Sequence, residues 1–252
     1  MRLDGAVVLL TGASSGIGAA TAQLMAARGA RLLVSGRDVA ALDRIAQACD
    51  AVALPADLAN PAQCDELASC AEAVHGRVDV VVLNAGIGWA GPFHEMPDAA
   101  IRSLVDVNLN APMILSRALL PGMLKRESGH VALVGSIAGL TGVAHEAVYA
   151  ATKAGLSIFA ESLRLECAGR SVGVSLIVPG VVDTPFFARR GTPYTRRTPR
   201  PVTPQLVAKT LVRAIERDRA QVVVPRWLSL AQAARVLSPS VYRLLAQRFG
   251  RP

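Results

Sequence analysis

Short apolar runs alternate along the chain with longer segments in which apolar residues recur every three or four positions. Short runs are typical of buried strands, and the longer periodic segments are typical of helices. The pattern predicts strands at residues 6–10, 31–35, 51–54, 78–83, 130–134, 172–178 and 221–224. It predicts helices at residues 17–28, 39–48, 61–75, 99–125, 149–168, 203–217, 228–237 and 240–249.

Helices between consecutive strands indicate a parallel sheet, because a parallel pair needs a long crossover connection. The sequence therefore predicts an α/β fold of the doubly wound Rossmann type, with a seven-stranded parallel sheet and helices on both faces. The ligand site of such a sheet lies beyond the carboxyl ends of its strands. Asn60 and Pro61 have the residue types of a helix start, and Pro112 is expected to kink the helix at 99–125.

The composition fits one domain spanning residues 1–252. Hydrophobic residues make up 52% of the chain and aromatic residues 4%, so small aliphatic side chains supply most of the core. Neither the four cysteines nor the four histidines have metal-ligand spacing, so we expect no metal site. We expect reduced, buried thiols in a cytoplasmic protein, at Cys49, Cys64, Cys70 and Cys167.

Positive charge is concentrated towards the C-terminal end. Residues 1–185 hold 13 Lys and Arg against 17 Asp and Glu, whereas residues 186–252 hold 14 against 2. The formal net charge of +8 therefore comes from the last quarter of the chain. Residues 184–204 include five prolines and five arginines, which predicts an irregular loop, and we interpret 185–204 as a substrate lid.

A glycine-rich segment, TGASSGIG at residues 11–18, follows the first predicted strand and opens the first predicted helix. Gly12 permits a tight exit from the strand, Gly16 lets the backbone approach a diphosphate, and Gly18 lets helix and strand pack closely. Unpaired N–H groups at the helix N-terminus then face the phosphates. Strand, glycine-rich turn, helix and second strand together predict a dinucleotide site.

The end of the second strand, Ser35-Gly36-Arg37-Asp38, indicates which nicotinamide cofactor is used. NAD sites place a carboxylate there, against the ribose hydroxyls. Gly36 occupies that place and Arg37 follows, which favours NADP(H) over NAD(H), because a guanidinium pairs with the 2′-phosphate. The alternative is that Arg37 is only a solvated charge. Asp38 is expected to cap the next helix, and Asp57 either contacts the adenine or starts a helix.

Tyr149 and Lys153 lie four residues apart on a predicted helix and therefore share a face. The pKa of a free tyrosine, about 10, is too high for efficient proton transfer at neutral pH, and we expect the Lys153 ammonium to lower it. Ser136, at the end of the fifth strand, is placed to polarise the same carbonyl oxygen. Asn108, in the middle of a helix, is a candidate to hold a water near Lys153.

In these motifs the chain resembles the short-chain dehydrogenase/reductase family, in its single-domain branch of roughly 250 residues. The resemblance covers about residues 5–185 and departs slightly at Leu83, where an asparagine often precedes Asn-Ala-Gly. It rests on six motifs in order: TGASSGIG at 11–18, NAG at 84–86, Asn108, Ser136, YAATK at 149–153 and PGVVDT at 179–184.

The resemblance implies that Ser136 orients the substrate, that Tyr149 is the general acid/base, and that Lys153 binds the nicotinamide ribose. It implies that Asn108 supports a water in a proton relay. It also implies a homodimer or homotetramer. The cofactor-binding residues would be Gly12, Ser14, Ser15, Gly16, Ile17, Gly18, Arg37, Asp57, Leu58, Asn84, Ala85, Gly86, Tyr149, Lys153, Pro179, Gly180, Val182 and Thr184.

The substrate is expected to be a small apolar carbonyl compound or alcohol, because aromatic side chains follow the motifs at both sides of the cleft. These are Trp89, Phe93, Phe186, Phe187 and Tyr194. Simple burial of these rings is the alternative. His145, four residues before Tyr149, either lines the cleft or lies on the surface.

Residues 225–252 mix large apolar residues with five arginines, which is typical of an amphipathic segment. Three interpretations remain open: peripheral contact with anionic lipid, an acidic carrier or CoA-type partner, and packing against the protein itself or a second copy. No nucleic-acid recognition module is visible. The function predicted is NADP(H)-dependent interconversion of a ketone or aldehyde and an alcohol. The alternatives are an NAD-dependent alcohol dehydrogenase and a catalytically silent cofactor-binding sensor or scaffold.

Overall fold

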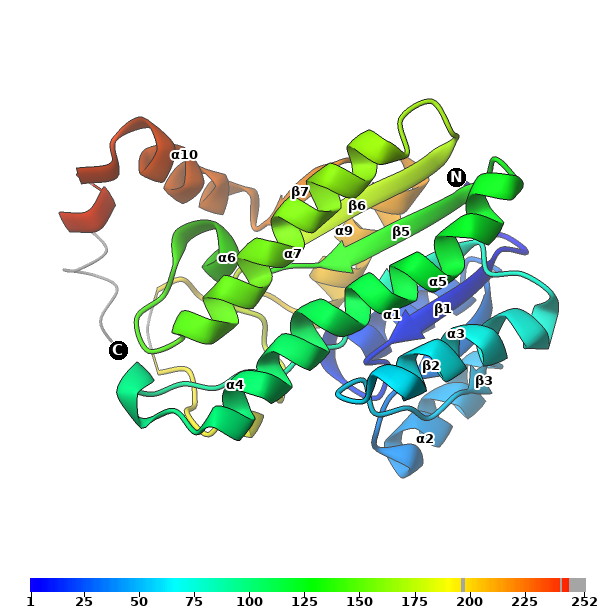
Figure 1. Cartoon of the computed structure of the whole chain (residues 1–252), viewed down its shortest axis with the longest axis horizontal. Helices are drawn as coiled ribbons and strands as arrows, with labels where there is room; N and C mark the ends of the chain where they lie inside the picture. Colours follow the sequence, from blue (N-terminus) through cyan, green and yellow to red (C-terminus); the bar gives the residue numbers. More distant parts are fainter. Residues whose placement is uncertain (196–197, 241, 245–252) are drawn as a thin grey trace.

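The computed structural model describes residues 1–195, 198–240 and 242–244. Within these residues, seven parallel strands form one sheet in the order β3-β2-β1-β4-β5-β6-β7 (Figure 1). The predicted doubly wound sheet is confirmed. The strands are β1 (Val7–Thr11), β2 (Arg31–Ser35), β3 (Val52–Ala53), β4 (Val80–Leu83), β5 (Gly129–Val134), β6 (Val172–Pro179) and β7 (Gln221–Val224).

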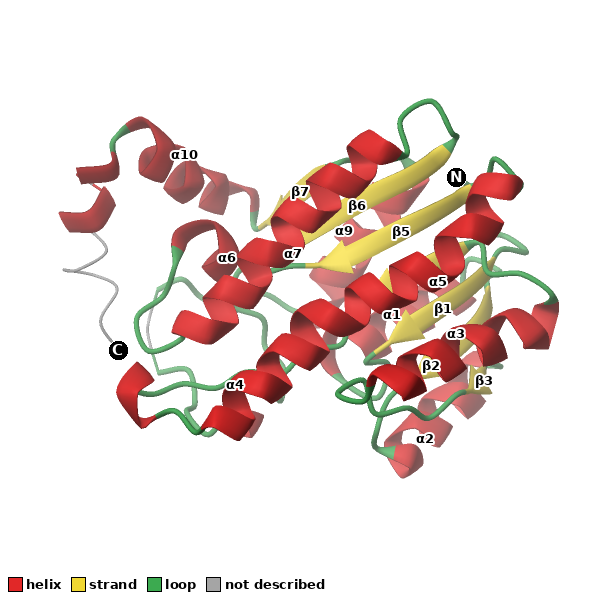
Figure 2. Ribbon diagram, viewed as in Figure 1, coloured by secondary structure: helices red, strands yellow, loops and turns green. Residues whose placement is uncertain are grey.

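Two layers of helices cover the sheet (Figure 2). One face carries α3 (Pro61–His75), α5 (Ala111–Lys125) and α7 (Ala147–Glu166), and the other carries α1 (Gly16–Ala26), α2 (Val39–Cys49) and α9 (Pro204–Glu216). Successive residues of β1 alternate between the two resulting cores: Val7 and Leu9 face the first, Val8 and Leu10 the second. Burial on both faces explains why the strands read as unbroken apolar runs.

The helix predicted at 99–125 is confirmed as one unbroken helical segment, and the irregularity expected at Pro112 lies just before it. The structure has α4 (Asp98–Val105), a π-helical turn η2 (Asp106–Asn110), and then α5. Pro112 has no N–H and cannot bond back to the carbonyl of Asn108, while the N–H of Ala111 bonds to the carbonyl of Asp106, five residues earlier. The irregular turn therefore precedes Pro112 and contains Asn108.

Two short helices at the carboxyl edge were not expected. Helix α6 (Ile137–Thr141) follows β5, and α8 (Phe186–Arg189) lies within the segment predicted to be irregular. Each is too short for a periodic apolar pattern to reveal it. The 3₁₀ turn η1 (Phe93–Glu95) precedes α4. The predicted helix starts at Asp38 and Asn60 are confirmed, since each side chain accepts a bond from the first turn of its helix.

The C-terminal segment lies beside α6, at one end of the molecule (Figure 1). It contains η3 (Arg226–Leu228) and α10 (Ser229–Leu237), and residues 239–240 and 242–244 are helical. The remainder of the helix predicted at 240–249 lies outside the described residues. Arg235 donates to the Leu140 carbonyl, and the Tyr242 hydroxyl donates to the Thr141 carbonyl. Within the described residues, no helix is long and apolar enough to span a membrane.

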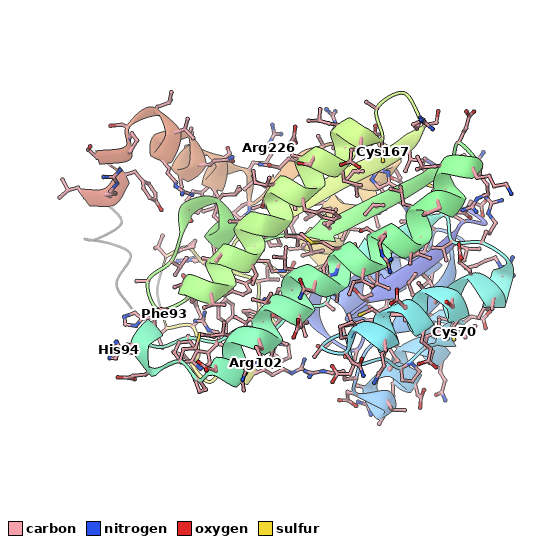
Figure 3. All side chains as sticks on the ribbon, viewed as in Figure 1. Cys70, Phe93, His94, Arg102, Cys167 and Arg226 are labelled. Carbon is pink, nitrogen blue, oxygen red and sulfur yellow. The ribbon has the colours of Figure 1, made fainter. Side chains whose placement is uncertain are left out.

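The four thiols are free, and three of them are buried in the core as expected: Cys49, Cys64 and Cys167. The expectation for Cys70 is wrong, because it lies on the exposed side of α3 (Figure 3). Six positions separate it from the buried Cys64, so the two residues lie on different faces of the helix.

Candidate functional site

A cavity of about 1300 Å³ opens at the carboxyl ends of the strands. Its wall comes from the segments after β1, β2, β3, β4, β5 and β6, together with the C-terminal segment. Gly18 and Asn108 lie outside this wall, but each contacts residues within it. The other predicted site residues all line it: Gly12, Ser14, Ser15, Gly16, Ile17, Arg37, Asp57, Leu58, Asn84, Ala85, Gly86, Ser136, Tyr149, Lys153, Pro179, Gly180, Val182 and Thr184.

The glycine-rich turn after β1 is packed so closely that Gly16 and Gly18 leave no room for a side chain. A Cβ added to Gly18 would lie 2.0 Å from the Gly12 carbonyl oxygen, so only glycine permits this packing of helix on turn. Gly16 has a φ of +56°, and an added Cβ would lie 2.9 Å from the Thr184 side chain. The start of α1 therefore packs closely against the turn and against Thr184, which only glycine at these two positions allows.

Asn84, which was predicted only to face the cofactor, also holds the turn. Its side-chain amide donates to the carbonyls of Thr11 and Gly12, at 3.0 and 3.1 Å. The Thr11 hydroxyl in turn accepts from the backbone N–H of Asn84, at 3.1 Å. The ends of β1 and β4 are thus joined directly beneath the glycine-rich turn.

The end of β2 presents no carboxylate at the predicted ribose position. Gly36 lines the cavity, and an added Cβ would lie 3.4 Å from the Ser14 hydroxyl. The Arg37 guanidinium is largely exposed and lies 4.0 Å from the carboxylate of Asp57. Asp38 caps α2, as predicted, and so is turned to the helix. Arg37, Asp38 and Asp57 are thus the charged residues that line the cavity at this end of the strand.

Asn108 is fully buried and bonds to the loop after β4 instead of facing the cavity. Its side-chain oxygen accepts from the N–H of Ile87, and its amide donates to the Ile87 carbonyl, both at 2.9 Å. The amide also approaches the Thr152 hydroxyl, at 3.3 Å. The π-helical turn places this side chain between the loop and α7. That Asn108 holds a water stays a prediction. The structure shows in addition that Asn108 positions the loop at Ile87.

Ser136, Tyr149 and Lys153 meet at the floor of the cavity. Ser136 caps α6 by accepting from the Ala138 N–H, and its side chain also hydrogen-bonds to Tyr149. Tyr149 and Lys153 project from α7, with Lys153 Nζ 6.0 Å from the centroid of the tyrosine ring. Lys153 donates to the carbonyl of Val134, at the end of β5. All three side chains are buried.

The expected direction of the Tyr149 pKa is wrong. Burial raises this pKa to about 12, and the hydrogen bond with Ser136 opposes the rise only in part. Burial also lowers the pKa of Lys153 to about 8. The spacing of the two residues placed them correctly on one face, and burial shifts the pKa of each towards its neutral form. The phenol of Tyr149 therefore stays protonated at neutral pH.

Aromatic rings continue from Tyr149 into the predicted lid. Tyr149 and Phe186 have ring centroids 5.6 Å apart, Phe186 and Phe187 5.5 Å, and Phe187 and Tyr194 5.4 Å. An added Cβ at Gly88 would lie 2.7 Å from Phe186, so the lid packs closely on the loop that Asn108 holds. These rings form an apolar wall beside Ser136, Tyr149 and Lys153.

The other two predicted aromatic residues do not line the cavity. Trp89 packs in a small cluster around Met96 and Leu104, and its ring lies against Gly91. Phe93 is 60% exposed and projects outward beside His94 at the outer end of the molecule (Figure 3). His145 is exposed at the cavity rim with a φ of +64°, so both interpretations of this residue hold.

Three charged residues in or beside the predicted lid make contacts that no sequence motif indicates. Arg190 forms a buried ion pair with Glu146, which directly precedes α7. Arg189 donates from Nη1 to the Ser15 hydroxyl in the glycine-rich turn, at 3.0 Å. No motif marks these contacts, since they join residues 44 and 174 positions apart. The C-terminal segment also reaches the cavity, through Leu228, Ala231, Tyr242 and Arg243.

A family model described as short chain dehydrogenase matches residues 6–194 of this chain. The chain belongs to the short-chain dehydrogenase family. It is accordingly an oxidoreductase that acts on CH–OH or C=O groups with a nicotinamide cofactor. The family match covers the glycine-rich turn, the Ser136, Tyr149 and Lys153 cluster, and the first part of the lid.

Individual relatives agree with this assignment. Ketoacyl reductase HetN of Nostoc sp. (strain PCC 7120) is 37% identical over 235 residues, covering 88% of this chain and 79% of the relative. A short-chain dehydrogenase from Sphingobium yanoikuyae in complex with NADPH has a TM-score of 0.82 at 27% identity, covering 93% of this chain and 96% of that chain. A 3-ketoacyl-(acyl-carrier-protein) reductase from Brucella melitensis complexed with NADH has a TM-score of 0.82 at 25% identity, covering 88% and 97%.

Proposed function

We propose that this short-chain dehydrogenase is an NADP(H)-dependent reductase that converts an apolar ketone or aldehyde to an alcohol, with Tyr149 as proton donor. The main support for this proposal is that the buried residues Ser136, Tyr149 and Lys153 all line the cavity. When bound, the nicotinamide supplies the hydride. The chain supplies the proton and the groups that hold the carbonyl.

Burial raises the pKa of Tyr149 to about 12, so the phenol carries the proton that the reduction consumes. Efficient transfer of that proton near neutral pH needs a lower pKa, which the positive charges of Lys153 and of an oxidised nicotinamide would provide. Ser136 can donate a second hydrogen bond to the carbonyl oxygen of the substrate. Lys153, held by the Val134 carbonyl, has its Nζ 6.0 Å from the centroid of the Tyr149 ring and is placed to contact the nicotinamide ribose.

The cavity fits a dinucleotide on its own geometry. The glycine-rich turn lines the cavity through Gly12, Ser14, Ser15 and Gly16, and Gly86 brings backbone against Asn108 and Lys153. At the β2 end, glycine in place of a carboxylate and the exposed guanidinium of Arg37 support NADP(H) over NAD(H). The volume of about 1300 Å³ leaves room for a substrate beside the cofactor.

The aromatic wall supports an apolar substrate. Phe186, Phe187 and Tyr194 belong to residues 185–204, which we propose act as the substrate lid of a single domain. The rings offer apolar area with few polar groups, which suits a lipophilic carbonyl compound better than a sugar.

The outer surface supports two contacts beyond the substrate. Ile158 and Leu165, seven residues apart on α7, are about 70% exposed, which supports a homodimer or homotetramer through this helix. On α10, Leu230, Val236 and Leu237 are also exposed, with arginines nearby, which supports peripheral contact of 225–252 with anionic lipid. The hydrogen bonds of Arg235 and Tyr242 to α6 hold the other side of this segment.

Replacing Tyr149 with Phe tests the catalytic assignment. The variant removes the proton donor and keeps the ring that stacks on Phe186, so turnover of a lipophilic ketone should fall by about a thousandfold. Affinity for NADPH, measured by fluorescence titration, should stay within about twofold. Retention of full turnover would contradict the role of Tyr149, and wild-type binding without any turnover would favour a cofactor sensor.

Replacing Arg37 with Ala tests the cofactor assignment. The wild type should bind NADPH more tightly than NADH, and the variant should lose about tenfold in NADPH affinity with little change for NADH. Arg44, an arginine of α2 outside the cavity wall, is the matched control. A wild-type preference for NADH would refute the NADP(H) proposal.

A further inference from the structure

Arg189, the last residue of α8, and Arg190, which follows it, differ in burial and in ion pairing. Arg190 is buried and donates to the carboxylate of Glu146, and its guanidinium lies 4.6 Å from the centroid of the Phe187 ring. Its charge is therefore neutralised within the lid. Arg189 is exposed, and among the described residues no carboxylate pairs with it. Its guanidinium donates a hydrogen bond to the Ser15 hydroxyl, at 3.0 Å.

This contact brings a guanidinium to the start of α1. Ser15 is the N-cap residue of that eleven-residue helix, and its hydroxyl accepts no bond from the helix backbone. Gly16 follows it, with the Thr184 side chain close against the backbone. Unpaired N–H groups of the first turn and the Arg189 charge thus face the same region of the cavity.

A neutral hydroxyl is a weak partner for a guanidinium, whereas a phosphate oxygen accepts charge-assisted and often bidentate bonds from it. We propose that Arg189 binds the diphosphate of the cofactor and so fastens the lid over it. This inference rests on the proposed function. The lid supplies this ligand from a segment far along the chain from the glycine-rich turn.

The geometry favours the diphosphate over the 2′-phosphate. The residue at the β2 end, Gly36, neighbours Ser14, and Arg37 already stands there. Arg189 instead contacts Ser15, which precedes the helix turn that faces Thr184. Arg189 is therefore expected to strengthen the binding of NADH and NADPH equally, because both carry the diphosphate.

The lid links this phosphate contact to the substrate wall. Arg189 lies between Arg190, which is bound to Glu146 beside α7, and the phenylalanines that stack towards Tyr149. A phosphate bound by Arg189 would hold these rings in place. Cofactor binding is therefore expected to order the apolar wall before the substrate enters.

The test replaces Arg189 with Gln and measures binding by calorimetry. Affinity for NADPH, NADH and adenosine 5′-diphosphate should each fall about tenfold, while affinity for adenosine stays unchanged. Arg200→Gln is the matched control, because it removes the same charge from the same lid at an exposed position. Arg189→Lys should restore part of the affinity. Circular dichroism and thermal melting show whether each variant is folded.

The outcomes separate this inference from the proposed function. Equal affinities of wild type and Arg189→Gln for the three nucleotides would overturn the role of Arg189 and leave the proposed function intact. A loss confined to NADPH would overturn the diphosphate assignment. Failure of the wild type to bind any of the nucleotides would refute the proposed function itself. An equal loss in Arg200→Gln would show a general field effect and also overturn the contact.

Discussion

Strands β5 and β6 carry one buried polar cluster near their amino ends and another near their carboxyl ends. The two clusters differ in how fully their side chains are paired within the protein. At the amino end, His130 shares a hydrogen bond with Ser175, at 2.9 Å, and the Ser175 hydroxyl donates to the Arg219 carbonyl. Since that hydroxyl has one proton, it accepts from the Nε2–H of His130. Arg164 and Asp218 close the cluster with a two-pronged ion pair. Every one of these side chains has a partner.

At the carboxyl end, the buried groups face a cavity. Burial holds the phenol of Tyr149 neutral and lowers the pKa of Lys153 to about 8. These side chains have few partners within the protein and are available to a ligand. The amino-end cluster therefore contributes stability through satisfied bonds, whereas the carboxyl-end cluster carries a desolvation cost that a catalytic site needs. The following predictions sharpen this difference.

A matched pair of serines should separate the two clusters most clearly. Ser136→Ala should lower turnover about a hundredfold, because a donor to the carbonyl oxygen is lost, and should cost only about 1 kcal/mol of stability through the α6 cap. Ser175→Ala should leave turnover unchanged and cost about 1–2 kcal/mol, because the His130 N–H and the Arg219 carbonyl lose their partner. Steady-state kinetics and urea unfolding measure both. Similar profiles for the two variants would contradict the division.

The pH dependence of stability should reveal the amino-end cluster. Burial lowers the pKa of His130 from 6.5 to about 4, so between these values the unfolded chain binds a proton that the folded chain does not. Stability should therefore fall as the pH drops from 6.5 towards 4, by about 2–3 kcal/mol from this residue. His130→Gln should flatten the urea-unfolding profile between pH 5 and pH 6.5. Parallel profiles for wild type and variant would refute the assignment.

Replacing Lys153 should change stability and activity in opposite directions. Its lowered pKa means that the folded protein bears a desolvation cost for the ammonium below pH 8. Lys153→Met should abolish turnover and raise the free energy of unfolding at pH 7 by about 1–2 kcal/mol, after allowing for the lost bond to Val134.

The same shift gives this prediction a pH signature. The wild type should recover stability as the pH rises through 8 towards 10.5, because the unfolded chain then binds the extra proton. The advantage of Lys153→Met should shrink over that range. A variant less stable than the wild type at pH 7 would show that the ammonium stabilises the fold.

Much of the fold could be predicted from the sequence, because strands buried on both faces leave an apolar run that needs no knowledge of their neighbours. The cap residues Asp38 and Asn60 could also be predicted, because a cap bonds only to the next turn of the chain. The long helix at 99–125 was predictable, but the exact place of its irregular turn was not, because Asn108 within that turn bonds to the distant loop at Ile87.

The sequence by itself determined that Tyr149 and Lys153, two of the proposed catalytic residues, share a face, because their four-residue spacing on a helix is enough for this. Only the tertiary structure decided what these groups do. Burial, which depends on all the surrounding elements, set the pKa of Tyr149 in the direction opposite to the one expected from Lys153. The contacts of Asn108 with Ile87 and of Arg189 with Ser15 likewise join distant segments. Such contacts exist only once the sheet has brought its carboxyl ends to one edge.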